Sequence, residues 1–191
     1  MISPGQRLGL IARYRSGEGE WLDLPSAKLT APADGRLVYS TGDPALKVTQ
    51  TFNTSGNVLD WNIEIETITN SAIEVGDLAI SLPMAGPSGE EPKAIFERGF
   101  LRHQFISGNG SFLYFVRASG VPPFLIVTVQ PGTAFEYYAG GAGRGGGPIF
   151  IHSGLSGGKE TRGTWRQQHT FLKLGRAGSK DSKAHYGLRF H

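Results

Sequence analysis

An alternation of apolar and polar side chains between residues 46 and 67 is the feature that most constrains how this chain can fold. Its apolar members are Leu46, Val48, Phe52, Trp61, Ile63 and Ile65. Successive side chains of a β-strand point to opposite faces, so each half of this segment can bury one face and expose the other. Between the halves, residues 53–57 are Asn, Thr, Ser, Gly and Asn, all of them turn-forming types. The pattern predicts a β-hairpin.

Similar short segments recur along the chain, and none has a sustained helical periodicity. The further candidate strands are 8–14, 35–39, 100–106, 112–117, 124–130, 149–152, 164–174 and 185–190. About nine to eleven short strands separated by turn residues are typical of a β-sandwich. The only helix candidates are two short segments, 26–29 and 92–97. We therefore predict a single all-β domain over residues 1–191, a β-sandwich of two mainly antiparallel sheets.

Composition limits the chemistry that the chain can perform and the partners that it can bind. There is no Cys, which excludes disulfides, thiolate zinc sites, Fe–S clusters and cysteine nucleophiles. No apolar run approaches the roughly 18 residues of a membrane-spanning helix. The net charge of +3 comes from 19 basic and 16 acidic residues, without the dense basic stripe that nucleic-acid binding requires. We expect neither a membrane nor a nucleic acid as a partner.

No motif for a cofactor, a metal or a nucleophile is complete. Gly141, Gly143 and Gly146 satisfy GxGxxG, but the strand-like segment 148–151 follows where the dinucleotide motif needs a helix. No two of the five His residues have a metal-binding spacing, and no Ser lies in a GxSxG motif. The sequence therefore predicts no cofactor, no metal site and no self-contained active site.

Glu64 and Glu66 are the one pair of carboxylates that could serve as catalytic groups. Residues two apart on a strand share a face and lie about 7 Å apart, which is close to the spacing of glycosidase carboxylates. A catalytic pair must act on the scissile bond from different directions, however, and neighbouring side chains on one flat strand rarely do so. A solvent-exposed polar face is the favoured interpretation, and a small glycosidase using Glu64 and Glu66 is the second alternative.

Aromatic residues near polar side chains give the remaining functional signal. Sugars present C–H faces that stack on aromatic rings and hydroxyls that bond to amides, carboxylates and guanidinium groups. Trp21 and Trp165 occur near polar residues, and the pair at 137–138 precedes a Gly-rich loop. Core packing is the alternative interpretation for each aromatic residue, most clearly for Trp61. The hypothetical carbohydrate-binding set is Trp21, Tyr137, Tyr138, Arg144 and Trp165.

Two regions together resemble a known type of domain. The sequence DWNIEIETITN at 60–70 is followed by IEVGDLAISLPM at 73–84, and TFLKL at 170–174 precedes YGLRF at 186–190. Over roughly 46–191 the chain resembles the N-terminal β-sandwich (supersandwich) domain of large bacterial glycosidase-like proteins. In those proteins the sandwich packs against an (α/α) helical barrel that carries the catalytic acids. The shared motifs are turns and strands, so the resemblance implies no catalytic residue in this chain.

The resemblance implies a role within a longer carbohydrate-active protein that is secreted or periplasmic. We predict a non-catalytic accessory domain of a glycoside hydrolase-like protein, with carbohydrate and a following helical-barrel domain as its partners. In this role the sandwich shapes a carbohydrate cleft together with the neighbouring domain. The alternative from a different class is a stand-alone, lectin-like glycan-binding module that uses Tyr137, Tyr138 and Trp165.

Overall fold

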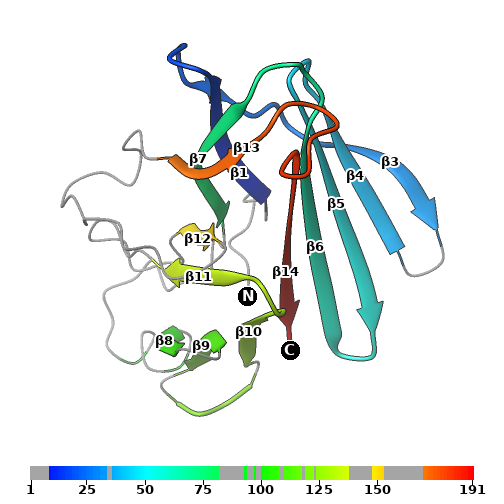
Figure 1. Cartoon of the computed structure of the whole chain (residues 1–191). Helices are drawn as coiled ribbons and strands as arrows, with labels where there is room; N and C mark the ends of the chain where they lie inside the picture. The colour runs from blue at the N-terminus through cyan, green and yellow to red at the C-terminus, as the bar shows by residue number, and fades with distance from the viewer. Residues whose placement is uncertain are drawn as a thin grey trace.

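The described part of the chain forms two antiparallel β-sheets, as predicted. The computed structural model describes residues 9–33, 36–81, 93, 97, 100–107, 110–117, 119–122, 124–137, 148–152 and 170–191. One sheet has six strands and the other has eight. Figure 1 shows β14 (Lys183–Phe190) beside β6 (Val58–Thr67), with β7 (Ile73–Ser81), β1 (Gly9–Ser16) and β13 (Thr170–Leu174) in the neighbouring sheet. The all-β sandwich is therefore confirmed.

The eight-stranded sheet is built around the predicted hairpin. Its spatial order is β3 (Lys28–Ala33), β4 (Arg36–Gly42), β5 (Leu46–Ser55), β6 (Val58–Thr67), β14 (Lys183–Phe190), β10 (Leu125–Val129), β9 (Gly110–Arg117) and β8 (Phe100–Ser107). Strands β5 and β6 pair continuously from Leu46 opposite Thr67 to Ser55 opposite Val58. The turn is shorter than predicted, because Gly56 adopts a φ of 57° and lets the strands close within two residues.

The six-stranded sheet is organised around β7 (Ile73–Ser81). On one edge, β7 pairs with β1 (Gly9–Ser16), which in turn pairs with β2 (Leu22–Asp23). On the other edge lie β12 (Pro148–His152), extended by β11 (Ala134–Tyr137), and β13 (Thr170–Leu174). Because β12 pairs with residues 79–81 of β7 and β13 with residues 73–76, the two strands share that edge. The outer face of this sheet near β1 and β2 carries the first candidate site.

The core consists of the apolar faces that the alternation predicted. Trp61 is completely buried, and its ring centroid lies 4.8 Å from that of Phe52 and 6.3 Å from that of Phe190. Ile63 and Ile65 are buried on the same face of β6. The main core members from the other sheet are Tyr14, Ile73, Val75, Ile80 and Leu174. The interpretation of Trp61 as a core residue is confirmed.

A buried hydrogen bond joins the two sheets. The Tyr14 hydroxyl on β1 donates to Asp43 Oδ2 at 2.5 Å, and Asp43 precedes β5 in the other sheet. The second oxygen, Oδ1, accepts the backbone N–H groups of Ala45 at 2.8 Å and Leu46 at 3.1 Å. Burial raises the pKa of Tyr14 to about 12, and the hydrogen bond to Asp43 and its charge act in the same direction. This contact fixes the position of β1 relative to the β4–β5 turn.

Local features differ from the prediction in two ways. The sheets contain more strands than the predicted nine to eleven, and β2, β3, β7 and β11 are the additional ones. The helix predicted at 26–29 is wrong, because Lys28 and Leu29 begin β3 and pair with Ser40 and Tyr39. Pairing with β4 outweighs the weak local helix preference there. Of the segment 92–97, Lys93 and Glu97 are helical, and the other four residues lie outside the described part.

Candidate functional site

The structure describes two of the five predicted carbohydrate-binding residues. Trp21 directly precedes β2, and Tyr137 is the last residue of β11. These strands are the opposite ends of the order β11-β12-β7-β1-β2, so about 19 Å of sheet, four strand spacings, separates them. The structure therefore does not bring Trp21 and Tyr137 together. Tyr138, Arg144 and Trp165 lie outside the described residues.

Trp21 lies against two arginine side chains of β1. Tyr14 pairs with Leu22, which sets Arg15 opposite Trp21 in the antiparallel register. Arg13 and Arg15 alternate with the buried Ala12 and Tyr14 and so project from the outer face of the sheet. Their guanidinium carbons lie 6.0 Å and 4.8 Å from the indole centroid. These distances indicate cation–π contacts.

Salt bridges extend this arrangement across three strands. Glu74 on β7 lies directly opposite Arg15 on β1 and Lys173 on β13. Its Oε2 accepts from Arg15 Nε at 2.8 Å and Nη2 at 2.7 Å, and its Oε1 lies 2.9 Å from Lys173 Nζ. We call the group of Arg13, Arg15, Trp21, Glu74 and Lys173 the Trp21 cluster. Asp23 lies at its edge, with Oδ1 3.7 Å from Arg13 Nε.

The Trp21 cluster offers an aromatic ring and hydrogen-bond donors in one place. An arginine guanidinium carries several N–H donors, and Nη1 of Arg15 makes no hydrogen bond with the described residues. The indole N–H of Trp21 is buried and has no acceptor within the described part of the chain. A ligand that stacks on this ring must share it with, or displace, the Arg15 guanidinium. The sequence pattern predicted Trp21 as a binding residue but gave no signal for the two arginines that contact it.

Glu64 and Glu66 lie on the outer face of the eight-stranded sheet. Glu64 is exposed and faces His185 across the β6–β14 pair. Glu66 lies opposite Lys183, with Oε1 3.1 Å from Nζ. This hydrogen bond, with the negative charge of Glu66, raises the pKa of Lys183. The two carboxylates thus belong to a polar, solvated strand face, which agrees with the interpretation favoured from the sequence.

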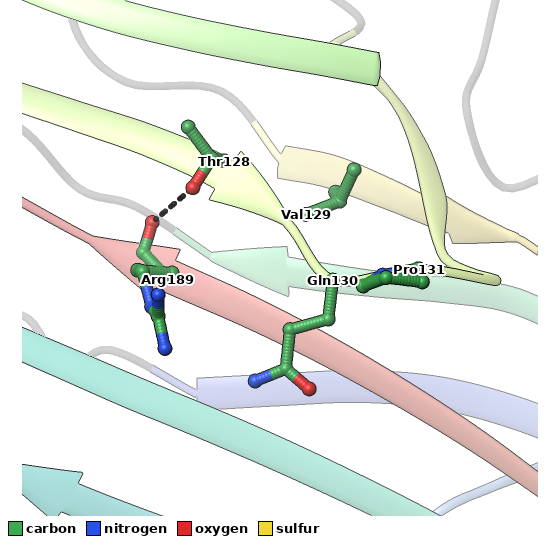
Figure 2. Close-up of a pocket in the computed structure, with 5 residues that line it drawn as sticks. All are labelled: Thr128, Val129, Gln130, Pro131 and Arg189. Carbon is green, nitrogen blue, oxygen red and sulfur yellow. Dashed lines mark hydrogen bonds between the residues drawn. The ribbon is translucent and has the colours of Figure 1, made fainter. Parts of the chain in front are cut away.

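A groove on the same sheet was not anticipated from the sequence. Its volume is about 370 Å³, and it is lined by Thr128, Val129, Gln130, Pro131 and Arg189 (Figure 2). We call these five residues the β10 groove. The groove forms because the end of β10 lies beside β14, and these strands are about 60 residues apart in the chain. Only the Pro131–Gly132 pair gives a sequence signal, and it predicts a turn rather than a site.

A bidentate ion pair holds one wall of the β10 groove. Arg189 Nε donates to Asp60 Oδ1 at 2.7 Å, and Arg189 Nη2 donates to Oδ2 at 3.0 Å. The hydrogen bond from Arg189 holds the pKa of Asp60 below its ordinary value, and the positive charge of the guanidinium adds to the effect. The same pairing raises the pKa of Arg189. The planar fork leaves the guanidinium in one orientation at the side of the groove.

The described residues contain neither a metal-binding group nor a membrane-spanning helix. Among them, no group of three or more His, Cys, Asp or Glu side chains is arranged to hold a metal ion. No helix within the described ranges is both long and apolar enough to cross a membrane.

Comparison with known proteins gives a likeness of fold. No protein-family model matches the chain, and no curated protein matches it in sequence. Among solved structures, a polysaccharide lyase is similar, with a TM-score of 0.59 and 10% sequence identity. The match covers 95% of this chain and 25% of the lyase, so the chain spans about a quarter of the length of that protein. At this identity the likeness shows the β fold and assigns no role to any residue.

Proposed function

We propose that this chain is a non-catalytic accessory β-sandwich domain of a carbohydrate-active protein. In this role it forms one wall of a carbohydrate cleft together with a neighbouring helical-barrel domain, as the resemblance to glycosidase-like proteins implies. One observation carries the proposal: 95% of the chain matches a quarter of a polysaccharide lyase. The same β architecture therefore occurs as one part of a larger protein that is named for its action on polysaccharides.

The Trp21 cluster is the surface that we propose faces carbohydrate. Hydroxyl oxygens of a sugar accept hydrogen bonds from guanidinium groups, and the apolar side of the sugar ring can pack on the indole. The donors project from β1 and β13, which lie on either side of β7 in one sheet, and side chains on strands are held more precisely than side chains on loops. Arg15 is further fixed by Glu74, so its remaining donors are oriented before a ligand binds.

The position of Glu64 and Glu66 supports a non-catalytic role. Glycosidase carboxylates act from either side of a scissile bond. Here both carboxylates project from one face of β6, and Glu66 is already paired with Lys183. Neither therefore occupies the position of a facing acid or base. A glycosidase based on this pair would require turnover by the chain that is lost on Glu64→Gln.

Calorimetric titration of the chain with a panel of oligosaccharides tests the surface assignment. We expect Trp21→Ala to weaken binding by about tenfold, because the variant removes the ring and the support that it gives to Arg15. Trp21→Phe keeps an aromatic ring and serves as the matched control, with a smaller loss. Unchanged affinity in Trp21→Ala would remove the Trp21 cluster from the proposal.

The same titration separates the lectin-like alternative. A stand-alone module that uses the neighbouring tyrosines would lose binding on Tyr137→Ala and Tyr138→Ala while Trp21→Ala binds normally. The accessory proposal expects the opposite pattern, because Tyr137 lies at the far edge of the sheet from Trp21. Failure of every oligosaccharide to bind would contradict both functions.

A further inference from the structure

The β10 groove lies on the outer face of the eight-stranded sheet, away from the core. Val127 is fully buried, and it pairs with Leu113 on β9 and with Phe190 on β14. Because strand residues alternate, Thr128 points the other way, as do its direct partners Phe112 on β9 and Arg189 on β14. The Trp21 cluster belongs to the other sheet. The groove is therefore a separate surface from the one described above.

A tight turn shapes the end of the groove. Thr133 N donates to Gln130 O at 3.0 Å, and Gly132 has a φ of 83°. Pro at the second and Gly at the third position are the residues that a type II turn prefers. Thr133 Oγ1 then accepts the backbone N–H of Gly187 at 2.9 Å. The hydrogen bond from Gly187 to the Thr133 side chain thus fixes the turn to β14.

Gly187 makes room for the Gln130 side chain on this face. A Cβ atom at Gly187 would lie 2.4 Å from Cδ and Oε1 of Gln130, so the Gln130 side chain occupies the space above the glycine. The Gln130 carboxamide makes no hydrogen bond with the described residues. Figure 2 shows it extending from the end of β10, on the same side as Arg189. It therefore presents unused donors and an acceptor at the groove.

The charges of the other polar groups at the groove cancel. Asp60 compensates the charge of Arg189, while Arg189 Nη1 makes no hydrogen bond with the described residues. Thr128 Oγ1 lies 3.5 Å from the Arg189 carbonyl oxygen (Figure 2). It also lies 3.2 Å from His191 Nε2. Donors and acceptors are therefore both present, and no uncompensated charge accompanies them.

Apolar surface adjoins these polar groups. Pro131 lines the groove, and Phe112 faces Thr128 across the β9–β10 pair. Val129 alternates with Thr128, and its side chain packs against the core. Phe112 is 36% exposed, and its ring stacks on that of Tyr114 with centroids 6.4 Å apart. Direct cross-strand partners have Cβ atoms about 5 Å apart, so the aromatic ring borders the groove.

We propose that the β10 groove binds an uncharged pyranose unit of a polysaccharide, with hydroxyls bonded to Gln130, Thr128 and Arg189 and one ring face beside Phe112. This inference rests on the proposed function and names a ligand class for a second surface of the same domain. A pyranose combines hydroxyl groups with a C–H face, which matches the mixed lining. An acidic sugar would compete with Asp60 for Arg189, and a purely apolar ligand would leave the Gln130 amide desolvated and unpaired. The volume of about 370 Å³ lies at the small end of the range for ligand sites.

Heteronuclear NMR titration tests the inference directly. The probes are neutral manno-, xylo- and cello-oligosaccharides, with oligogalacturonate and oligoalginate as acidic counterparts. We expect at least one neutral probe to shift the side-chain amide signals of Gln130 and the Nε–H signal of Arg189 in a saturable manner. Gln130→Ala should weaken this binding by about fivefold, the loss expected for a hydrogen bond. Phe112→Ala should weaken it by up to about tenfold.

Two further variants make the test specific. Gly187→Ala forces the Gln130 side chain from its place without removing the amide, so it should also weaken binding, with retention of the fold checked by its melting curve. Glu64→Gln changes an exposed group on the same sheet outside the groove and should bind within twofold of the parent chain.

Three results would overturn the inference. They are the absence of shifts at Gln130 and Arg189 with every neutral probe, unchanged affinity in Gln130→Ala, and tighter groove binding by the acidic probes. If neutral probes bind but depend on Trp21 alone, the groove inference fails while the proposed function stands. If they depend on Gln130 and not on Trp21, the groove inference holds and the Trp21 assignment fails.

Discussion

The Trp21 cluster and the β10 groove contain similar residue types, yet they differ in which polar groups are already bound to protein partners and which a ligand could use. In the Trp21 cluster, Arg15 and Lys173 share Glu74, and the indole ring is in contact with guanidinium groups. In the β10 groove, one Arg–Asp pair is complete, but the Gln130 amide makes no hydrogen bond with the described residues. An aromatic residue beside arginines is therefore not by itself an open binding platform. The partners that the fold supplies decide which groups are left for a ligand.

The largest expected effect comes from removing the shared carboxylate of the Trp21 cluster. Glu74→Ala leaves Arg15 and Lys173 without their acceptor on adjacent strands, and Glu74 is only 18% exposed. We expect the free energy of unfolding to fall by about 2 kcal/mol, between the costs of breaking an exposed and a buried pair. Urea denaturation measures this change. Glu74→Gln, which keeps an acceptor oxygen, should lose less, and equal losses would show that the acceptor is unimportant.

The next largest loss of stability is expected at Tyr14, on the buried face of β1. Tyr14→Phe removes the hydroxyl bonded to Asp43 while the two backbone donors to Asp43 stay, so we expect a loss of about 1 to 2 kcal/mol. The raised pKa of Tyr14 means that its neutral form stabilises the folded chain. That contribution is complete below the ordinary value of 10.0 and is lost as the pH rises toward about 12.

Absorbance during an alkaline titration can check the Tyr14 assignment. Tyr14→Phe should remove one phenol that ionises near pH 12 in the parent chain. Ionisation of every tyrosine near the ordinary pH would contradict the buried Tyr14–Asp43 contact.

A smaller loss in the free energy of unfolding is expected on breaking the Arg189–Asp60 ion pair of the β10 groove. Arg189 and Asp60 side chains are 47% and 25% exposed, so Asp60→Asn should cost below about 1 kcal/mol despite the bidentate geometry. The pKa of Asp60 is lowered in the folded chain, so the pair stabilises above its ordinary value of 3.8 and is lost as the pH falls through the lowered value.

Unfolding curves between roughly pH 2 and 6 test the sign of this effect. Asp60→Asn should show a shallower loss of stability in acid than the parent chain does. If the stability of both proteins falls equally with decreasing pH, Arg189 and Asp60 do not interact in solution. The contrast between this ion pair and the Glu74 salt bridges would then be wrong.

The smallest effect is expected at Glu64. Because this side chain is exposed and forms part of a solvated strand face, Glu64→Gln should change stability by less than about 0.5 kcal/mol. Thermal melting of the two proteins in parallel measures this. A large loss would show that Glu64 has a structural or functional partner beyond the described contacts.

Local patterns predicted much of the fold. The alternation between 46 and 67 identified the β5–β6 hairpin and the buried face that contains Trp61, because one strand period fixes which side chains share a face. The same logic placed Glu64 and Glu66 on the outer face. The helix predicted at 26–29 failed because its structure depends on pairing with β4, and local propensity does not report such pairing.

Contacts between distant segments could not be predicted in this way. The Tyr14–Asp43 bond joins residues 29 apart, and the Arg189–Asp60 pair joins residues 129 apart. Trp21 was identified as a candidate, but its contacts with Arg13 and Arg15 follow from the β1–β2 register. The β10 groove requires β10 and β14 to be neighbours, and nothing in either segment specifies its partner.

Binding of carbohydrate by the chain without cleavage is the most direct test of the proposed function. The measurement is a calorimetric titration to saturation with the best-binding oligosaccharide, followed by mass spectrometry of the same sample after prolonged incubation. We predict a saturable binding heat and an oligosaccharide of unchanged mass. Shortened or unsaturated products, formed by the parent chain and absent with Glu64→Gln, would contradict this prediction and make the chain an enzyme in its own right.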